Sequence, residues 1–311
     1  MSKLSAACRM GLLSSALFGS LAHAELSVLI VEGLGGEAGY QQEFDADVKA
    51  IQHASVTLTS AERIQVLAGE GATLNNINAV FKQLSTTLGK EDRLALYLVG
   101  HGSYDGYEYK FNIPGADLSG TQLKKLLDGV KADNQLIVAT GSSSGALQDV
   151  LKQDSRVILT ATRTGNERNA THFGRLFAEA LQEPAIDTDK NGRVTAQEAF
   201  DLATRKVNDY FTAESRLATE HAQISGAQAG AFSLAQLAGA MQPQVTTANA
   251  GLLAERDKLN SQLEELRLKK DQLGDEEYFK QLEPLMLKLA ELDAQLSQGG
   301  DANAGSAEAT P

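Results

Sequence analysis

Five runs of Val, Leu and Ile in the first half of the chain constrain the fold more than any other feature of the sequence. The runs are continuous rather than alternating, as expected of strands buried on both faces of a parallel sheet. Amphipathic segments separate them, so the pattern predicts an α/β domain with a mostly parallel sheet flanked by helices. The runs are LSVLIVEG, RIQVLAGE, LALYLVGHG, LIVAT and RVILTATR.

Apolar spacing and capping residues predict the helices between these runs. Serines and glycines near 118–120 and 142–145 are expected to cap two of them. Sites in parallel sheets lie beyond the carboxyl ends of the strands, so the loops that follow the runs are the candidate functional regions. The predicted helices cover 74–89, 118–130, 143–153, 169–182 and 196–220.

The first 24 residues have the pattern of a secretory signal peptide. Lys3 and Arg9 give a basic start, and the apolar core that follows is too short to span a bilayer. Ala-His-Ala at 22–24 is a small-residue cleavage site. We expect residues 1–24 to be removed, leaving no transmembrane segment, and the remainder to be periplasmic or secreted.

Removal of this segment changes both the redox chemistry and the charge of the chain. Cys8 is the only cysteine, so the mature chain would have neither a thiol nor a disulfide. The segment carries two basic and no acidic residues, so the net charge of −12 would become −14. Such an acidic chain repels phosphate backbones, which argues against a nucleic-acid partner.

The C-terminal part differs in composition from the α/β part, which we assign to 25–227. Small residues over 228–247 indicate a linker. Apolar positions at heptad spacing over 248–297, interrupted near Gly274, predict a helical hairpin or a coiled coil. The second arm would place Phe279, Leu282, Met286, Leu289, Leu292 and Leu296 on one seam, with Pro284 starting or kinking it. This part either packs on the main domain or joins copies of the chain, and 298–311 is expected to be a disordered tail.

Two loops carry the candidate chemistry. The third run ends in His101-Gly102, where glycine lets a substrate backbone approach closely. The fourth run ends one helical crossover later in the Gly-Ser-Ser-Ser-Gly turn at 141–145. If the two strands are neighbours, His101 and this serine turn lie side by side.

These two motifs, in this order and strand context, resemble the caspase–legumain clan of peptidases. The nearest group is the legumain-like C13 family with its bacterial relatives. The resemblance covers about 26–202 and implies that His101 is the catalytic histidine and that the Gly102 N–H helps to bind the oxyanion. Ser142 falls on the nucleophilic cysteine, and Ser144-Gly145 matches the Ser-Gly after it. Arg163, Glu167 and Arg168 follow the next strand, where the resemblance implies a substrate pocket for an extended peptide.

Serine at the cysteine position changes the chemistry. A thiol is partly ionised near neutral pH, whereas a serine hydroxyl needs a base hydrogen-bonded to it. In the clan, the histidine acts mainly on the leaving group and stands apart from the nucleophile. Ser142 would then be poorly activated, which favours an impaired relative that still holds peptide. A serine-type hydrolase that uses His101 and Ser142 is the alternative.

The same turn also fits the nucleophile elbow of α/β-hydrolases, G-x-S-x-G. The nucleophile would then be Ser143, and the histidine would be His172 or His221. Both histidines fall in predicted helices rather than after a last strand, and this interpretation leaves His101 without a role.

The most specific local motif is DTDKNGRVTAQE at 187–198, which matches an EF-hand calcium loop without a gap. Gly192 allows the sharp turn, and Val194 is expected in the core. A single loop more often stabilises a fold than senses a signal, so we expect a structural Ca²⁺ site. The expected ligands are Asp187, Asp189, Asn191, the Arg193 carbonyl, Thr195 and Glu198.

Three kinds of function therefore compete. The chain is a hydrolase that acts through Ser142 or Ser143, a peptide-binding member of a peptidase family, or a scaffold that assembles through 248–297.

Overall fold

The computed structural model describes residues 25–237 and 273–304, together with individual residues between 251 and 266. The predicted signal peptide, most of the predicted linker and residues 305–311 lie outside the described residues. In the described part, no helix is both long and apolar enough to cross a membrane.

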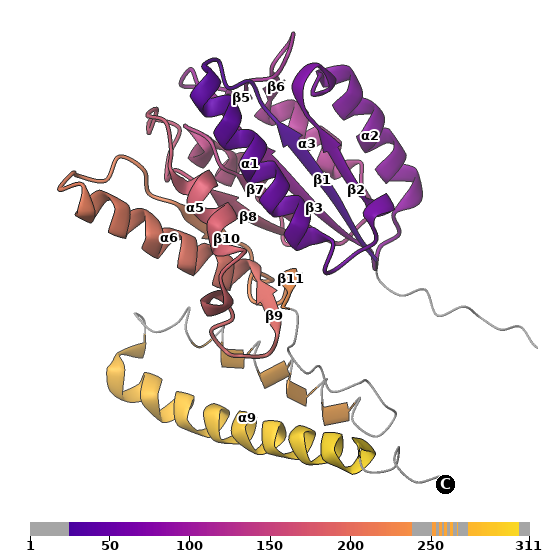
Figure 1. The fold of residues 1–311 in the computed structure, drawn as a ribbon, viewed down its shortest axis with the longest axis vertical. Coiled ribbons are helices and arrows are strands. Elements are labelled where there is room, and N and C mark those ends of the chain that lie inside the picture. Colours follow the sequence, from indigo (N-terminus) through magenta and orange to yellow (C-terminus); the bar gives the residue numbers. More distant parts are fainter. Residues whose placement is uncertain are drawn as a thin grey trace, which may run out of the picture.

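A six-stranded sheet forms the centre of the α/β part (Figure 1). Its order is β10-β8-β7-β3-β1-β2, and all neighbouring strands are parallel except β10, which runs antiparallel along β8. The mostly parallel α/β fold predicted from the apolar runs is confirmed. The strands are β1 (Leu26–Glu32), β2 (Ile64–Leu67), β3 (Arg93–Val99), β7 (Asn134–Ala139), β8 (Arg156–Thr160) and β10 (Gln223–Ser225).

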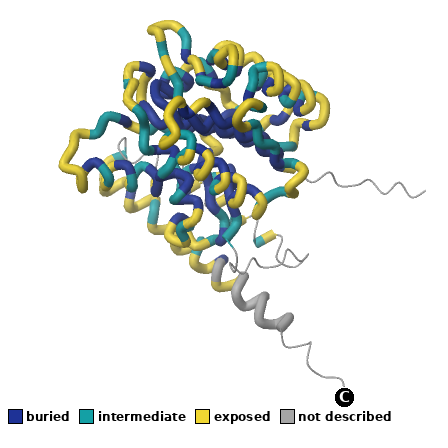
Figure 2. The backbone as a smooth tube through the Cα atoms, turned by 45° about the horizontal axis from the view of Figure 1, so that its top comes forward, coloured by how far each residue is buried: buried dark blue, intermediate teal, exposed yellow. Residues whose placement is uncertain are grey.

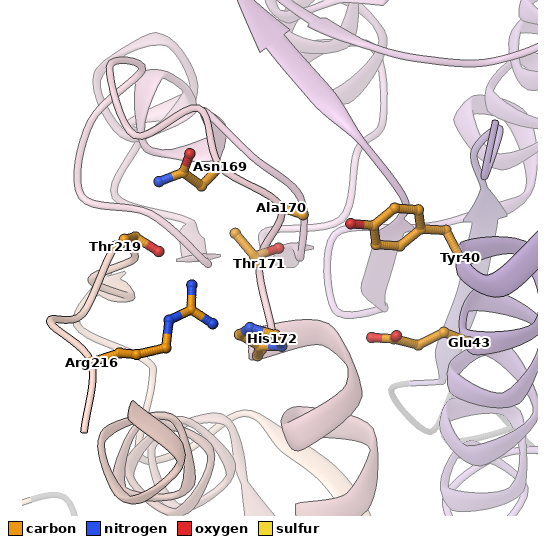
Figure 3. A pocket seen from close by; sticks show the side chains of 8 residues that line it. All are labelled: Tyr40, Glu43, Asn169, Ala170, Thr171, His172, Arg216 and Thr219. Atoms are coloured by element: carbon orange, nitrogen blue, oxygen red, sulfur yellow. The ribbon is translucent and has the colours of Figure 1, made fainter. Parts of the chain in front are cut away.

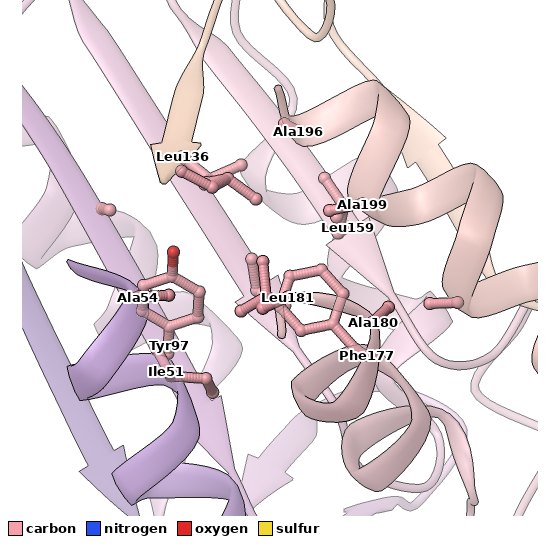
Figure 4. Close-up of a cluster of buried hydrophobic side chains, with 14 of the residues drawn as sticks. Ile51, Ala54, Tyr97, Leu136, Leu159, Phe177, Ala180, Leu181, Ala196 and Ala199 are labelled. Atoms are coloured by element: carbon pink, nitrogen blue, oxygen red, sulfur yellow. The ribbon is translucent and has the colours of Figure 1, made fainter. Parts of the chain in front are cut away.

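Helices cover both faces of this sheet, so the central strands are buried (Figures 1 and 2). On one face lie α1 (Ala38–Ser55), α5 (Phe173–Ala180) and α6 (Ala196–Ala213). On the other lie α2 (Leu74–Thr87), α3 (Gly120–Asp128) and α4 (Leu147–Leu151). Alternate residues of one strand point to opposite faces of the sheet. Tyr97 packs in the hydrophobic cluster between the sheet and α1, α5 and α6, which is drawn in Figure 4. Its neighbour Leu96 packs in the cluster between the sheet and α2, α3 and α4.

Two small sheets and four 3₁₀ turns complete this part. A meander of β4 (Gly102–Tyr104), β5 (Tyr109–Phe111) and β6 (Leu118–Ser119) follows β3. The strand β9 (Arg193–Thr195) pairs with β11 (Ser233–Gln236). The 3₁₀ turns are η1 (Ala61–Arg63), η2 (Gly69–Gly71), η3 (Ser144–Ala146) and η4 (Pro184–Ile186).

The structure differs from the predicted linker at 228–247. Residues 228–237 belong to the folded domain, because β11 lies in them and Phe232 and Leu234 are buried in the core. Small residues here allow close packing rather than flexibility. Two helices are also shorter than predicted: α5 begins only at Phe173, and α6 ends at Ala213.

The C-terminal helix α9 (Asp275–Ala304) contains Pro284 in its interior, so the proline does not start the helix. It also extends into the predicted tail, 298–311. Its buried side chains include Tyr278 and Leu292, whereas Phe279 and Met286 are 57% and 49% exposed. The buried side of α9 therefore differs from the predicted apolar seam, which included Phe279 and Met286.

Candidate functional site

The candidate site lies where the chain reverses its direction of travel across the sheet. From β1 the chain goes to β2 on one side and then returns to β3 on the other, so β1 and β3 flank a switch point. The register that pairs Leu98 of β3 with Ala139 of β7, continued beyond the strands, brings His101 opposite Ser142. The predicted proximity of the two loops therefore agrees with the strand order.

Glycines allow the two loops to approach closely. A Cβ placed on Gly141 would lie 2.1 Å from the carbonyl oxygen of Gly100 and 3.1 Å from the amide nitrogen of Gly102. A Cβ on Gly102 would lie 2.7 Å from the carbonyl oxygen of Ser142 and 2.4 Å from the hydroxyl of Tyr109. These positions exclude larger residues and keep the Gly102 backbone against the serine turn.

His101 sits in an aromatic corner formed by helix α1. The ring of Tyr40 meets it edge-on at 4.7 Å between centroids, and that of Phe44 does so at 5.1 Å. Burial lowers the pKa of His101, while a hydrogen bond to the backbone of Gly35 and the charge of Glu43 act in the opposite direction. The net direction is downward, so the ring is mainly neutral at neutral pH.

The serines of the turn are more buried than a capping role requires. Ser142 is 5% exposed, and no hydrogen bond joins its hydroxyl to His101 in the described part of the chain. Ser143 adopts a left-handed conformation with φ of 57°, and its amide donates to the Glu167 carbonyl at 2.8 Å. Ser144 contacts Thr162 instead of capping a helix. The prediction that these serines cap the following helix is therefore wrong, because neither η3 nor α4 has a side-chain cap, and the Ser144 hydroxyl binds Thr162 in the neighbouring loop.

The α/β-hydrolase elbow at Ser143 is not assembled. Ser143 is completely buried, and its hydroxyl has no hydrogen-bond partner among the described residues, so no base contacts it. The ring of His172 packs on Tyr210 at 4.1 Å, and His221 pairs with Glu167 at 2.9 Å. Neither histidine has the contact that the elbow interpretation requires.

The loop after β8 is fixed to the serine turn. The backbone of Arg163 would lie 2.3 Å from a Cβ on Gly145, so only glycine fits there. The Glu167 carboxylate accepts hydrogen bonds from the amides of Arg163, at 2.9 Å, and His221, at 3.1 Å. Glu167 thus links the loop after β8, the segment before β10 and, through its carbonyl, the serine turn. The side chains of Arg163 and Arg168 are exposed, and neither lines the cavity described next.

A cavity of about 380 Å³ opens between α1 and the loop before α5 (Figure 3). Tyr40, which packs on His101, forms part of its wall together with Glu43. Figure 3 shows the Arg216 guanidinium on the opposite side and His172 between them. The cavity thus offers a carboxylate and a guanidinium to the same polar ligand. It is lined by Tyr40, Glu43, Asn169, Ala170, Thr171, His172, Arg216 and Thr219.

Sequence patterns did not identify most of these lining residues, because they come from segments far apart in the chain. Glu220 was missed as well. It is 2% exposed and accepts hydrogen bonds from the amides of His172, at 2.7 Å, and Phe173, at 3.1 Å, at the start of α5. Burial raises its pKa to about 7 in spite of these two hydrogen bonds. A lone Glu in a loop gives no pattern that would reveal this role.

The acidic loop at 187–198 brings its carboxylates together. Asp187, Asp189 and Glu198 each offer an oxygen, and these oxygens all lie within 4.8 Å of one another. Gly192 has φ of 80°, as the sharp turn requires, and Val194 is fully buried. Desolvation and the charges of Glu198 and Asp187 raise the pKa of Asp189 to about 6. A bound cation would relieve that repulsion.

The rest of the expected ligand set is arranged around these carboxylates. The side-chain oxygen of Asn191 accepts a hydrogen bond from the Arg193 amide at 2.7 Å. Thr195 and Glu198 form a capping box at the start of α6. The donor set therefore consists of oxygen atoms only, which suits a hard cation such as Ca²⁺.

A model of the peptidase C13 family matches residues 40–229, a span that contains His101, Ser142 and the acidic loop. No curated protein is significantly similar to the chain. Among solved structures, protein GSU0716 from Geobacter sulfurreducens is 11% identical, with a TM-score of 0.45. That similarity covers 69% of this chain and 99% of the other.

Proposed function

Since the chain belongs to the peptidase C13 family, we propose that it is a catalytically impaired member that holds an extended peptide beside His101 and Ser142. The observation that carries the proposal is the environment of Ser142. Its hydroxyl is buried and has no hydrogen bond to His101 among the described residues. An unassisted hydroxyl is a poor nucleophile, so acyl transfer would be slow.

The cavity between α1 and the loop before α5 supports a binding role. Tyr40 contacts His101 and also lines the cavity, so a bound side chain would lie next to the candidate catalytic residues. The carboxylate of Glu43 and the guanidinium of Arg216 provide an acceptor and donors for a polar group. A peptide with a polar side chain at this position is the ligand class that the cavity fits.

A cleavage assay with a peptide library separates the candidate functions. We expect no turnover by the wild type and measurable turnover by Ser142→Cys, because a thiolate needs no attached base. Wild-type turnover that is lost in Ser142→Ala would instead establish a serine-type peptidase. If Ser142→Cys is folded, yet neither cleaves nor binds any library peptide, the peptide-holding proposal fails, and a scaffold that acts through 248–297 replaces it.

We further propose that the acidic loop binds calcium. The close carboxylates, the left-handed Gly192 and the oxygen-only donor set fit this ion. When bound, Ca²⁺ would neutralise the loop charges. Asp187, Asp189, Asn191, Arg193, Thr195 and Glu198 would hold it between α5 and α6.

Export remains part of the proposal. The segment that would direct it, residues 1–24, lies outside the described residues. N-terminal sequencing of the protein purified from the cell envelope tests this point. A mature chain that begins at Glu25 is expected, and a chain that retains residues 1–24 in the cytoplasm would contradict it.

A further inference from the structure

The segment 214–222, which joins α6 to β10, forms one wall of the cavity. Arg216 and Thr219 belong to this segment, and Figure 3 shows them across the cavity from Tyr40 and Glu43 of α1. The segment is neither helix nor strand. Contacts with other parts of the domain must therefore hold this wall in place.

A carboxylate anchors the segment. Of residues 214–222, all of which the structure describes, only Glu220 is buried, with 2% of its surface exposed. Its two oxygens accept hydrogen bonds from the amides of His172, at 2.7 Å, and Phe173, at 3.1 Å. At the start of a helix, amides have no partner within the helix, and the helix dipole favours a negative charge. An acid from a distant segment therefore caps α5.

Apolar contacts alone would hold the segment weakly. Ala218 and Ala222 pack against the core, but both are small and only partly buried, and Leu217 is 90% exposed. A buried carboxyl costs stability unless it is hydrogen-bonded. The two amides of α5 supply these bonds, so the burial of Glu220 is favourable only while the segment lies on the helix.

Glu220 thus joins two walls of the cavity. One wall is the end of the loop before α5, with Thr171 and His172, and the other is the segment itself, with Arg216 and Thr219. Glu220 follows Thr219 in the chain and binds the amide of His172. Loss of this attachment would let the two walls separate.

We propose that Glu220 is a positioning residue that sets the width of the cavity by clamping 214–222 to the start of α5. The clamp keeps the Arg216 guanidinium and the Thr219 hydroxyl in reach of the ligand group that Glu43 contacts from the other side. The inference rests on the proposed function for the class of ligand, an extended peptide. The clamp itself requires no ligand.

Hydrogen exchange on the full chain, followed by NMR at single amides, tests the clamp. In Glu220→Ala we expect the amides of His172, Phe173 and 214–222 to exchange about tenfold faster than in the wild type or more, because two hydrogen bonds to a carboxylate are lost. The increase should exceed that of the β3 amides, which exchange when the sheet opens. This comparison separates local release of the segment from a general loss of stability.

Two variants serve as controls. Glu214→Ala removes an exposed carboxylate from the same segment and should leave the exchange as in the wild type. Glu220→Gln keeps one acceptor oxygen and replaces the other by an N–H donor, so its exchange should lie between those of the wild type and Glu220→Ala. If Glu220→Ala does not fold, Glu220→Asp, which retracts the carboxylate by one methylene, takes its place. A folded Ala or Asp variant whose two walls exchange like those of the wild type would overturn the inference.

Kinetics in the Ser142→Cys background connect the clamp to binding. For a library peptide that Ser142→Cys cleaves, the addition of Glu220→Ala should raise KM by a larger factor than it lowers kcat, because Glu220 does not touch the reacting residues. Faster exchange with an unchanged KM would contradict the positioning of substrate. If Ser142→Cys neither cleaves nor binds peptides, faster exchange in Glu220→Ala would leave the clamp standing and remove the proposed function.

Discussion

At the scale of single residues, Glu167 has a different role from the one expected. The resemblance placed it in a substrate pocket, but both its carboxylate oxygens are occupied within the chain. Its carbonyl also accepts the amide of Ser143 next to the candidate nucleophile. One residue therefore fixes the serine turn, the loop after β8 and the segment before β10.

Replacing Glu167 by alanine should destabilise the fold. The amides of Arg163 and His221 would lose their acceptor, and an unsatisfied partly buried donor costs about 1–3 kcal/mol. Urea unfolding measures the change. The adjacent Arg168→Ala removes an exposed side chain and should change the free energy of unfolding by less than about 0.5 kcal/mol. Equal stability of the two variants would contradict the linking role.

Asp47 makes the stability depend on pH. It is 4% exposed, and burial followed by repulsion from Glu43 raises its pKa from its ordinary value of 3.8 to about 7. The folded state therefore binds the proton more tightly than the unfolded state. The contribution of Asp47 protonation to the free energy of unfolding is therefore fully present below about pH 4, and it is lost as the pH rises through about 7.

Asp47→Asn mimics the neutral acid and should flatten this dependence. Between pH 5.5 and pH 8, we expect the loss of stability to shrink by on the order of 1 kcal/mol in this variant. The exposed Asp154→Asn serves as the control and should follow the wild type. Urea unfolding at both pH values measures the free energy of unfolding. If this free energy falls equally from pH 5.5 to pH 8 in Asp47→Asn and in the wild type, Asp47 is not a source of the pH dependence.

At the scale of elements, the acidic loop joins α5 to α6 and pairs through β9 with β11. In the described part of the chain, β11 is the only strand that pairs with β9. A cation in the loop would therefore fasten two helices and one strand at once, which agrees with a structural rather than a switching role.

Calcium should raise the melting temperature. At a free concentration about 100 times Kd, the stabilisation is about 2.7 kcal/mol, or several degrees. Glu198→Gln should abolish the rise, since Gln still satisfies the capping box but carries no charge. Glu214→Gln, an exposed acid at the end of α6, is the matched control. A melting temperature that calcium and chelator leave unchanged would rule out the site.

The sequence predicts elements well where the apolar signal is strong and poorly where it is weak. All five apolar runs became strands; four of them are buried, and β2 at the edge of the sheet is only partly buried. Helix α1 was not predicted, since Asp47 interrupts its apolar face and half of its residues are polar or charged. The meander β4-β5-β6 was also missed, because strands of two or three residues show no measurable alternation.

At the scale of the whole molecule, crossover spacing indicated that His101 and Ser142 meet, because neighbouring strands keep a constant register. The cavity could not be predicted from the sequence in this way. Its walls come from α1, from the loop before α5 and from the segment after α6, which only the complete fold brings together. The ring of Tyr40 connects the two regions, and nothing in its local sequence distinguishes it.

Self-association through 248–297 stays a prediction, and α9 provides a way to test it. Phe279, Met286 and Leu287 are about half exposed, at 57%, 49% and 59%. We expect the full chain to form oligomers and the double variant Phe279→Glu, Met286→Glu to be monomeric. Lys288→Glu changes charge on the same helix and should keep the oligomer. Light scattering measures the mass. The same mass for the wild type and the double variant would show that Phe279 and Met286 do not join copies of the chain.

The attachment of β11 also has a mechanical consequence. The amide of Leu237 donates to the carbonyl of Gly192 at 2.9 Å, so the folded domain ends on the acidic loop itself. Tension applied to the C-terminal segment would therefore load the β9–β11 ladder before any strand of the central sheet. The rupture force in a single-molecule pulling experiment would report the state of this ladder, and an ion in the loop would make the molecule harder to unravel from that end.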